Sequence, residues 1–241
     1  MSRPEKGRSV SRNLEHFNIA QISTIKKARI MMTWCLDSAV ERNKKAPYTF
    51  YIPSPAVIEM LQKGDKVKLI FVSTEQEDEY TCERMWVEIA KLEGEYFIGE
   101  LLNHPVKLTN LELGQTVSFS KEHISDTEYR DPEEHKWDYY FDSKIIVSND
   151  VLEREEFNFL LRDYPRDDED TGWTVFSGYE DDEYVNDPDN LQVISIGAIL
   201  NMDDSVLAFI QDEPQCAYDR HQETGKFVKI HDFAWDDYHN G

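Results

Sequence analysis

An amphipathic pattern lies near the start of the chain. Between residues 25 and 40, apolar side chains recur three and four positions apart, which is the spacing of one helix face. These side chains are Ile25, Ala28, Met32, Cys35, Leu36 and Ala39. Arg42, Lys44 and Lys45 follow, where positive charges suit a helix C-terminus, and Pro47 ends the helix. The pattern predicts a helix packed on the core, with a helix on a membrane surface as the alternative.

A strand-rich region follows, in which apolar and polar positions alternate. Residues 67–71 and 85–89 have the period of two that is typical of strands. A turn is predicted at Gly94, after which residues 96–102 run back as a strand. Residues 48–52 are also expected to be extended. The region therefore predicts a small, mainly antiparallel sheet.

A short internal repeat occurs within this region. Residues 61–69 and 111–119 share the pattern Leu-x-x-Gly-x-x-Val-x-apolar. The shared glycines, Gly64 and Gly114, are expected to take a turn conformation that a side chain would resist. The repeat predicts two similar turns, each leading into a strand.

The second half of the chain mixes strand and helix signals. Strands are predicted over residues 144–148 and 172–178. Asp203 is expected to cap a helix that runs through Ile210. A hairpin is expected to close the chain over residues 216–230.

Together these patterns predict an α+β protein of two small mixed domains. The first is mainly antiparallel β with an N-terminal helix, and the second is a sheet with short helices. The expected divisions are a flexible basic tail over 1–17, a helix plus β-rich domain over 18–126, a linker over 127–142 and an acidic α+β domain over 143–241. Within the linker, Trp137 and Tyr140 are expected to dock on a neighbouring element.

Charge changes the picture most, because it is uneven along the chain. The formal net charge is −22 over 241 residues. Residues 1–50 hold ten Lys or Arg against four Asp or Glu, whereas residues 151–241 hold six against 23. Such a surface repels nucleic acid and anionic lipid, and it attracts basic partners. The plainer interpretation is that acidity only keeps the protein soluble.

Cysteine use and hydropathy indicate the compartment. Cys35, Cys82 and Cys216 are widely spaced and odd in number, so a reducing cytoplasm with the cysteines as small core residues fits best. No apolar run approaches the roughly 20 residues that span a bilayer. No secretory signal is visible behind the basic N-terminus. We therefore expect a cytoplasmic protein.

The common catalytic and metal-binding motifs are missing from the sequence. It has no glycine-rich phosphate loop, no Gly-x-Ser-x-Gly and no His-Glu-x-x-His. The seven histidines do not pair at zinc-ligand spacing. Counting a calcium loop from Asp167 places glycine correctly at Gly172 but leaves Gly178 where a glutamate is required. No cofactor, metal or catalytic residue is predicted.

Two acidic clusters are the candidates for partner binding. They flank the predicted strand at 172–178 and are interleaved with aromatic residues, as interface hot spots often are. The candidate residues are Asp167, Asp168, Glu169, Asp170, Trp173, Tyr179, Glu180, Asp181, Asp182, Glu183 and Tyr184. Both clusters are expected at one edge of the domain. The alternative is a pair of solvated loops with no partner.

The first half resembles a widespread bacterial domain family of unknown function. The residues that carry the resemblance are Glu83 to Ile89, Gly99 to Pro105, Gly114 with Val117 and Phe119, and His123-Ile124. The resemblance covers roughly residues 45–126. Because the family has no established activity, it implies no catalytic residue. We expect Trp86, Gly99, Asn103, Pro105 and Gly114 to set turns and packing.

The second half resembles an immunity-protein-like family found beside polymorphic bacterial toxins. The resemblance spans roughly residues 143–230 and is carried by Val147-Ser148, Asp170 to Trp173, Phe176 to Gly178, Glu180 to Tyr184, Asp187 to Asn190, and Asp219-Arg220. Asp-Thr-Gly-Trp stands where the family has Asp-Ser-Gly-Trp. Immunity proteins bind a toxin tightly, often through acidic surfaces against cationic nucleases.

These observations favour a binding protein over an enzyme. The expected function is an immunity-type protein that masks the active surface of a cognate, basic toxin. A regulatory or housekeeping binding module is the alternative, and a hydrolase built from paired carboxylates is the third reading.

Overall fold

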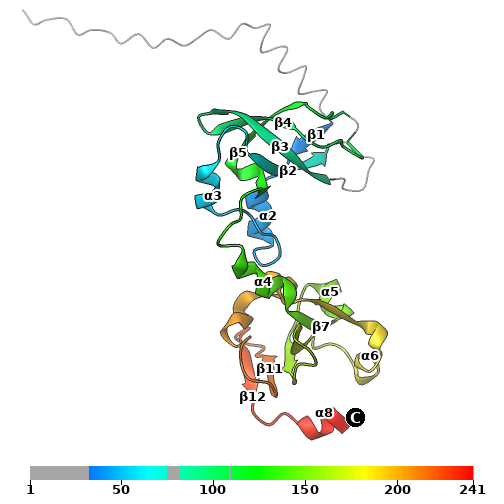
Figure 1. Ribbon diagram of the computed structural model, residues 1–241. Coiled ribbons are helices and arrows are strands. Elements are labelled where there is room, and N and C mark those ends of the chain that lie inside the picture. Colours follow the sequence, from blue (N-terminus) through cyan, green and yellow to red (C-terminus); the bar gives the residue numbers. More distant parts are fainter. Residues whose placement is uncertain (1–32, 75–81, 109, 241) are drawn as a thin grey trace, which may run out of the picture.

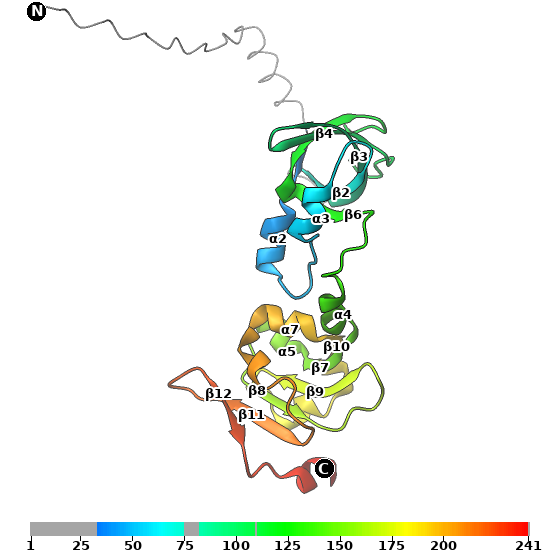
Figure 2. The same ribbon diagram turned by 60° about the vertical axis from the view of Figure 1, so that its left-hand side comes forward.

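The computed structural model describes residues 33–74, 82–108 and 110–240. These residues form two six-stranded sheets, each with its own hydrophobic core. Figure 1 and Figure 2 show the two sheets one above the other, with helices between them. The predicted α+β class with two mixed domains is confirmed. Below, the first and second domains are the parts of the chain that build the first and second sheet.

The first sheet is entirely antiparallel. Its strands are β1 (Trp34–Leu36), β2 (Lys66–Ser73), β3 (Cys82–Glu93), β4 (Tyr96–Leu101), β5 (Thr116–Ser120) and β6 (Ile124–Thr127). They lie in the order β1-β2-β3-β4-β5, and β6 pairs with β2. Alternate residues point inward, and Val67, Leu69 and Phe71 of β2 meet Val87 and Ile89 of β3 in the core. Helices α2 (Ala39–Lys45) and α3 (Pro55–Met60) and the 3-10 helix η1 (Lys121–His123) complete this domain.

The repeated glycines have the predicted role. Gly64 and Gly114 have φ of 95° and 79°, in the left-handed region that favours glycine. Gly64 N donates to Ile89 O at 2.7 Å, and Gly114 N donates to Leu101 O at 2.8 Å. Each turn is thus tied to a neighbouring strand immediately before β2 or β5 begins.

The predicted helix over residues 25–40 is wrong within the described residues; the rest of it lies outside them. Trp34–Leu36 form strand β1, because Trp34 packs on Phe71 at 5.3 Å and its backbone pairs with β2. The helix begins only at Ala39, after Ser38, whose side chain accepts from Glu41 N. Pairing with a core strand outweighs a local helical spacing. The expected basic tail over 1–17 also lies outside the described residues.

The second sheet is mixed. Its strands are β7 (Lys144–Ser148), β8 (Phe159–Arg162), β9 (Asp170–Phe176), β10 (Leu191–Ser195), β11 (Cys216–Arg220) and β12 (Phe227–Ile230). They lie in the order β10-β7-β9-β8-β11-β12, with β7 and β9 parallel and all other pairs antiparallel. The predicted strand at 144–148 and the closing hairpin are confirmed, and the strand predicted at 172–178 is β9, which begins and ends two residues earlier.

Short helices accompany the second sheet. They are α4 (His135–Asp142), α5 (Asn149–Arg154), α6 (Asp182–Val185), η2 (Pro188–Asn190), α7 (Ile196–Met202), η3 (Asp204–Ala208) and α8 (Trp235–Asn240). Asp203 caps η3 as predicted, although η3 is a 3-10 helix. Residues of α5, α7 and η3 pack on the inner face of the sheet, around Trp173 and Val175.

The segment expected to be an aperiodic linker contains α4. Tyr140 of α4 packs on the second core, and Trp137 lies edge-on to Tyr51 at 6.0 Å. Asp131 precedes α4 and is only 4% exposed; it accepts from Tyr51 Oη and from Ser54 N, both at 2.6 Å. The segment is therefore held against the first domain at one end and the second domain at the other.

A second connection joins the domains directly. Residues 48–52, expected to be extended, form turns and loop instead and reach α7. Tyr48 N donates to Asn201 Oδ1 at 2.9 Å, and Asn201 Nδ2 donates to Thr49 Oγ1 at 2.6 Å. Tyr48 Oη donates to Asp204 Oδ2 at 2.9 Å, and burial together with the Asp204 carboxylate raises the pKa of Tyr48 to about 12. We call the contact of Tyr48 and Thr49 with α7 and Asp204 the joint.

The cysteines differ from expectation. Cys216 is buried in the second core as predicted, but Cys35 and Cys82 are exposed. Both lie on strands that flank β2, opposite Val72. The helical spacing that placed Cys35 inward does not apply in a strand, where the neighbouring Trp34 takes the inward position.

Candidate functional site

The conspicuous residues of the first domain hold loops in place. Asn103 Oδ1 accepts from Trp86 N at 2.6 Å. The Glu83 carboxylate accepts from the backbone N–H groups of three consecutive residues at 2.8 to 2.9 Å, namely Val106, Lys107 and Leu108. A Cβ at Gly99 would lie 2.5 Å from Glu88 O. These contacts agree with the structural roles expected for this motif.

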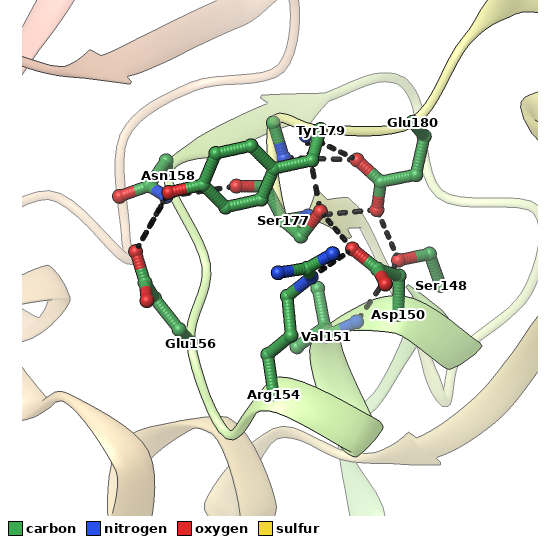
Figure 3. A network of polar contacts seen from close by, with 10 residues as sticks. Ser148, Asp150, Val151, Arg154, Glu156, Asn158, Ser177, Tyr179 and Glu180 are labelled. Carbon is green, nitrogen blue, oxygen red and sulfur yellow. Dashed lines mark hydrogen bonds and ion pairs between the residues drawn. The ribbon is translucent and has the colours of Figure 1, made fainter.

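A polar network occupies the carboxyl end of the parallel strands β7 and β9 (Figure 3). Ser148 and Ser177, the residues at these strand ends, are both fully buried. The Glu180 carboxylate accepts from Ser148 Oγ, from Ser177 N at 2.8 Å and from Gly178 N at 2.9 Å. Glu180 therefore fixes the loop after β9 rather than presenting a free charge.

The network ends at the surface beside an aromatic ring. Asp150 accepts from Ser177 Oγ and from Arg154 Nε, both at 2.6 Å. The Arg154 guanidinium lies over the ring of Tyr179, 4.7 Å from its centroid, and Tyr179 is 62% exposed. Tyr179 is the one predicted aromatic contact whose ring is well exposed and held in place by charged neighbours, as Figure 3 shows.

Trp173 does not lie at the surface. It is 1% exposed in the second core, and its Nε1 donates to Ile210 O at 3.0 Å. The ring is therefore not available to a partner in this structure, which corrects its assignment as a contact anchor. Tyr184, also predicted as a contact, is half-buried and donates its backbone N–H to the Asp181 side chain.

The two acidic clusters lie at opposite ends of β9, not at one edge. Asp167–Asp170 precede the strand, and Glu180–Glu183 follow it. Seven residues at about 3.3 Å each place the clusters roughly 20 Å apart. A single patch of eight carboxylates is therefore not formed.

Each cluster contains residues with structural duties. Asp170 accepts from Arg166 Nε at 2.6 Å and from Gly172 N at 2.9 Å, and burial of this carboxyl is outweighed by these bonds, so its pKa lies below the usual value. Asp167 caps its own loop, and Asp181 caps α6. The outward, exposed carboxylates that remain are Asp168, Glu169, Asp182 and Glu183.

Three residues of the network were missed at the level of sequence. They are Ser148, Asp150 and Arg154. A signal was present, because Ser148 caps α5, and Asp150 and Arg154 stand four residues apart on that helix. The helix is six residues long, which is too short for a periodic pattern to stand out.

Within the described residues, Ser120, His123 and Glu122 lie close together in a way that resembles a catalytic triad of serine, histidine and a carboxylate. Ser120 Oγ lies 2.9 Å from His123 Nδ1, and Glu122 lies 3.8 Å from His123 Nε2. Ser120 N also donates to His123 Nδ1, so the pair forms a capping box at the start of η1. Among all residues that the structure describes, no group of three or more His, Cys, Asp or Glu is placed to hold a metal ion.

Glu180 gives the second domain an acid-sensitive contact. Burial opposes ionisation of Glu180, but bonds from Ser148 and Ser177 outweigh it and lower its pKa. A lowered pKa adds stability above the unfolded value of about 4.3, and this stability is lost as pH falls through the folded pKa. We expect Glu180→Gln to destabilise the domain by about 1–3 kcal/mol at pH 7 and to flatten its acid dependence.

Urea unfolding between pH 3 and pH 7 measures this effect. Glu183→Gln, which removes an exposed carboxylate three residues away, is the matched control and should follow the wild-type profile. Equal profiles for Glu180→Gln and the wild type would show that the network adds no stability.

Comparisons with known proteins separate the two halves of the chain. Residues 32–148 match the family described as Uncharacterized protein conserved in bacteria (DUF2314). Residues 145–231 match the Immunity protein Imm33 domain, which indicates an immunity-type role in toxin systems. No curated protein and no solved structure matches the chain. Among the described residues, no helix combines the length and apolar character needed to cross a membrane. The first half of the chain thus resembles a bacterial family without a characterised function, and the second half resembles a family of immunity proteins.

Proposed function

We propose that the protein neutralises a cognate toxin by covering its active surface. The observation that carries the proposal is the match of residues 145–231 to an immunity domain. The polar network supports it, because it fixes the loop that carries Tyr179 and leads into α6, where Asp182 and Glu183 are exposed. A loop that is ordered before binding loses little entropy on binding.

The partner in this proposal is a basic protein. Residues 151–241 carry 23 acidic against six basic side chains. A field of this sign slows approach to nucleic acid and anionic lipid and accelerates encounter with cationic surfaces. Action in the cytoplasm belongs to the same proposal, and three cysteines that form no disulfide fit a reducing compartment.

Growth rescue tests the function. The chain is co-expressed with the toxin encoded beside its gene in a host that the toxin kills, and growth is expected to be restored. Continued killing despite soluble expression of both chains contradicts the proposal. The slowly associating charge variant described next should rescue growth less well than its matched control, which distinguishes binding from other effects.

Electrostatic steering predicts a large effect on the association rate. The variant Asp168→Asn, Glu169→Gln, Asp182→Asn, Glu183→Gln removes four exposed charges and leaves the structural carboxylates Asp170 and Glu180 in place. Association with the toxin, measured by stopped flow at low salt, is expected to slow about ten-fold, with little change in dissociation.

A matched control removes charge elsewhere. Glu59, Glu95, Glu100 and Glu112 of the first domain are exposed, and their replacement by Gln removes the same number of negative charges. This variant is expected to associate at close to the wild-type rate. Equal slowing of the two variants would mean that net charge, and not these loops, steers the partner.

A further inference from the structure

The second sheet has an apolar outer face, on the side opposite the core. Alternation along the strands places Trp173 and Val175 inward and Thr174 and Phe176 outward. Cross-strand pairs extend this outer face across the sheet. Its residues are Ile146, Phe159, Leu161, Thr174, Phe176 and Ala217. In Figure 2, α5 and α7 lie on one side of this sheet, and α8, at the C-terminal end, lies on the other.

Residues 231–240, which we call the cover, lie on this outer face. Phe233 stacks on Phe159 with ring centroids 6.0 Å apart. Tyr238 lines a cavity of about 150 Å³ together with Ile146 and Thr174. His239 Nε2 lies 2.9 Å from Asp163 Oδ2 at the end of β8. Leu161 and Ala217 are 2% and 0% exposed on this face.

The cover is held less tightly than the face that it protects. Every residue from 231 to 239 is half-buried or exposed. Its helix, α8, has six residues, and a helix of that length has little stability of its own. Its contacts with the sheet include the stacking of Phe233 on Phe159 and the exposed contact of His239 with Asp163, and contacts of these kinds contribute about 1 kcal/mol or less each. The cover is therefore a segment that a competing partner can displace.

The cover also lies beyond the part of the chain that matches the immunity domain. That match ends at residue 231, where the cover begins. The matched residues include every strand of the sheet, so they build the outer face without the segment that shields it.

The margins of the outer face have the composition of a binding surface. Val193 on edge strand β10 and Val228 on edge strand β12 are 65% and 51% exposed. They pair with Ile146 and Asp219, which places them on the same face. Asp219 is exposed, and Asp163 is half-buried. An apolar centre with a polar margin is the usual anatomy of a protein interface.

We propose that the basic toxin docks on the outer face of the second sheet and displaces the cover. This inference rests on the proposed immunity function and adds an apolar contact surface, in addition to the loop that carries Tyr179, and an internal competitor. Acidic residues at the margin meet the positive charge of the toxin, while the apolar centre takes up its contact side chains. The fraction of chains with the cover released sets the apparent affinity.

Two variants of the full-length chain test the proposal against the purified, inactivated toxin encoded beside the gene. Phe233→Ala with Tyr238→Ala loosens the cover, and the toxin is expected to bind about ten-fold more tightly, since more chains are open. Val193→Arg with Val228→Arg adds positive charge to the exposed margin, and binding is expected to weaken at least about ten-fold. Val106→Arg, at an 87% exposed valine of the first domain, is the control.

A peptide reports on the cover independently of the toxin. A labelled peptide with the sequence of residues 231–240 is expected to bind the loosened variant and not the wild type, in which the tethered cover competes. Failure of this peptide to bind the loosened, folded variant would show that the outer face does not hold the cover reversibly, which overturns the proposal.

The outcomes separate this inference from the proposed function. If wild-type chain neither binds the toxin nor rescues growth, the proposed function fails. If wild type binds but both double variants bind with unchanged affinity, only the docking site fails. Light scattering tests a further outcome. If Val193→Arg with Val228→Arg dissociates a dimer of the chain and leaves toxin binding intact, the outer face joins two copies and the docking proposal is wrong.

Discussion

Truncation of Trp173 to alanine is expected to lower the free energy of unfolding of the second domain by about 3–5 kcal/mol. The indole is fully buried, packs near Phe209 and Tyr218 at 6.1 and 6.2 Å, and donates to Ile210 O. Alanine leaves a cavity in the core and removes the shorter of the two hydrogen bonds to Ile210 O, which keeps only the 3.5 Å contact from Arg162 Nη1. Urea unfolding followed by circular dichroism measures the loss.

Trp235→Ala is the matched control for the loss of an indole. Trp235 lies in the cover and is half-buried, so its removal is expected to cost less than about 1 kcal/mol. Equal destabilisation by the two variants would contradict the placement of Trp173 at the centre of the core. Toxin binding by Trp173→Ala is informative only if the variant retains the native spectrum.

Replacement of Gly172 by alanine is expected to destabilise the second domain by about 2–5 kcal/mol. Gly172 has φ of 77°, and a Cβ there would lie 2.0 Å from the backbone oxygen of Asp163. Because that oxygen belongs to the backbone, no rotation of a side chain relieves the clash. The bond from Asp163 N to Gly172 O, 2.9 Å long, would be strained with it. Thermal unfolding measures the effect.

Gly225→Ala separates the two causes of the expected destabilisation, which are the positive φ and the clash of the new Cβ with the backbone. Gly225 has a similar φ of 66°, but a Cβ there meets no atom within 4 Å. It therefore carries the conformational cost without the clash, and about 1–2 kcal/mol is expected. A loss at Gly172 no larger than the loss at Gly225 would mean that the strands β8 and β9 move apart readily.

Strands could be predicted where alternation coincided with a turn. Apolar residues recur at every second position in 67–71 and 85–89, and Gly64 and Gly94 mark turns beside these segments with positive φ. Prediction failed where pairing with a distant strand decided the conformation. The three residues of β1 become a strand because β2, thirty positions later, offers an edge and Phe71 offers a packing partner for Trp34. The sequence within a few residues of Trp34 contains neither the edge of β2 nor the ring of Phe71.

The candidate site could be predicted in part. The acidic loops were found from composition, but composition does not distinguish a structural carboxylate such as Glu180 from an outward one such as Glu183. The difference depends on which backbone N–H groups face each side chain after folding. The burial of Trp173 could not be predicted from the sequence either, because an aromatic residue between acidic residues has the same local sequence in a core as at an interface.

The joint bears on how such proteins recombine. Tyr48 and Thr49 lie within the part that matches the uncharacterised family, whereas Gly197 and Asn201 lie within the part that matches the immunity domain. A Cβ at position 197 would lie 2.5 Å from Tyr48 O. A different immunity domain spliced behind the same first domain would therefore keep the joint only with a glycine and an amide at these two positions. Under the proposed function, toxin specificity is therefore exchanged together with the second domain only where that domain carries this pair.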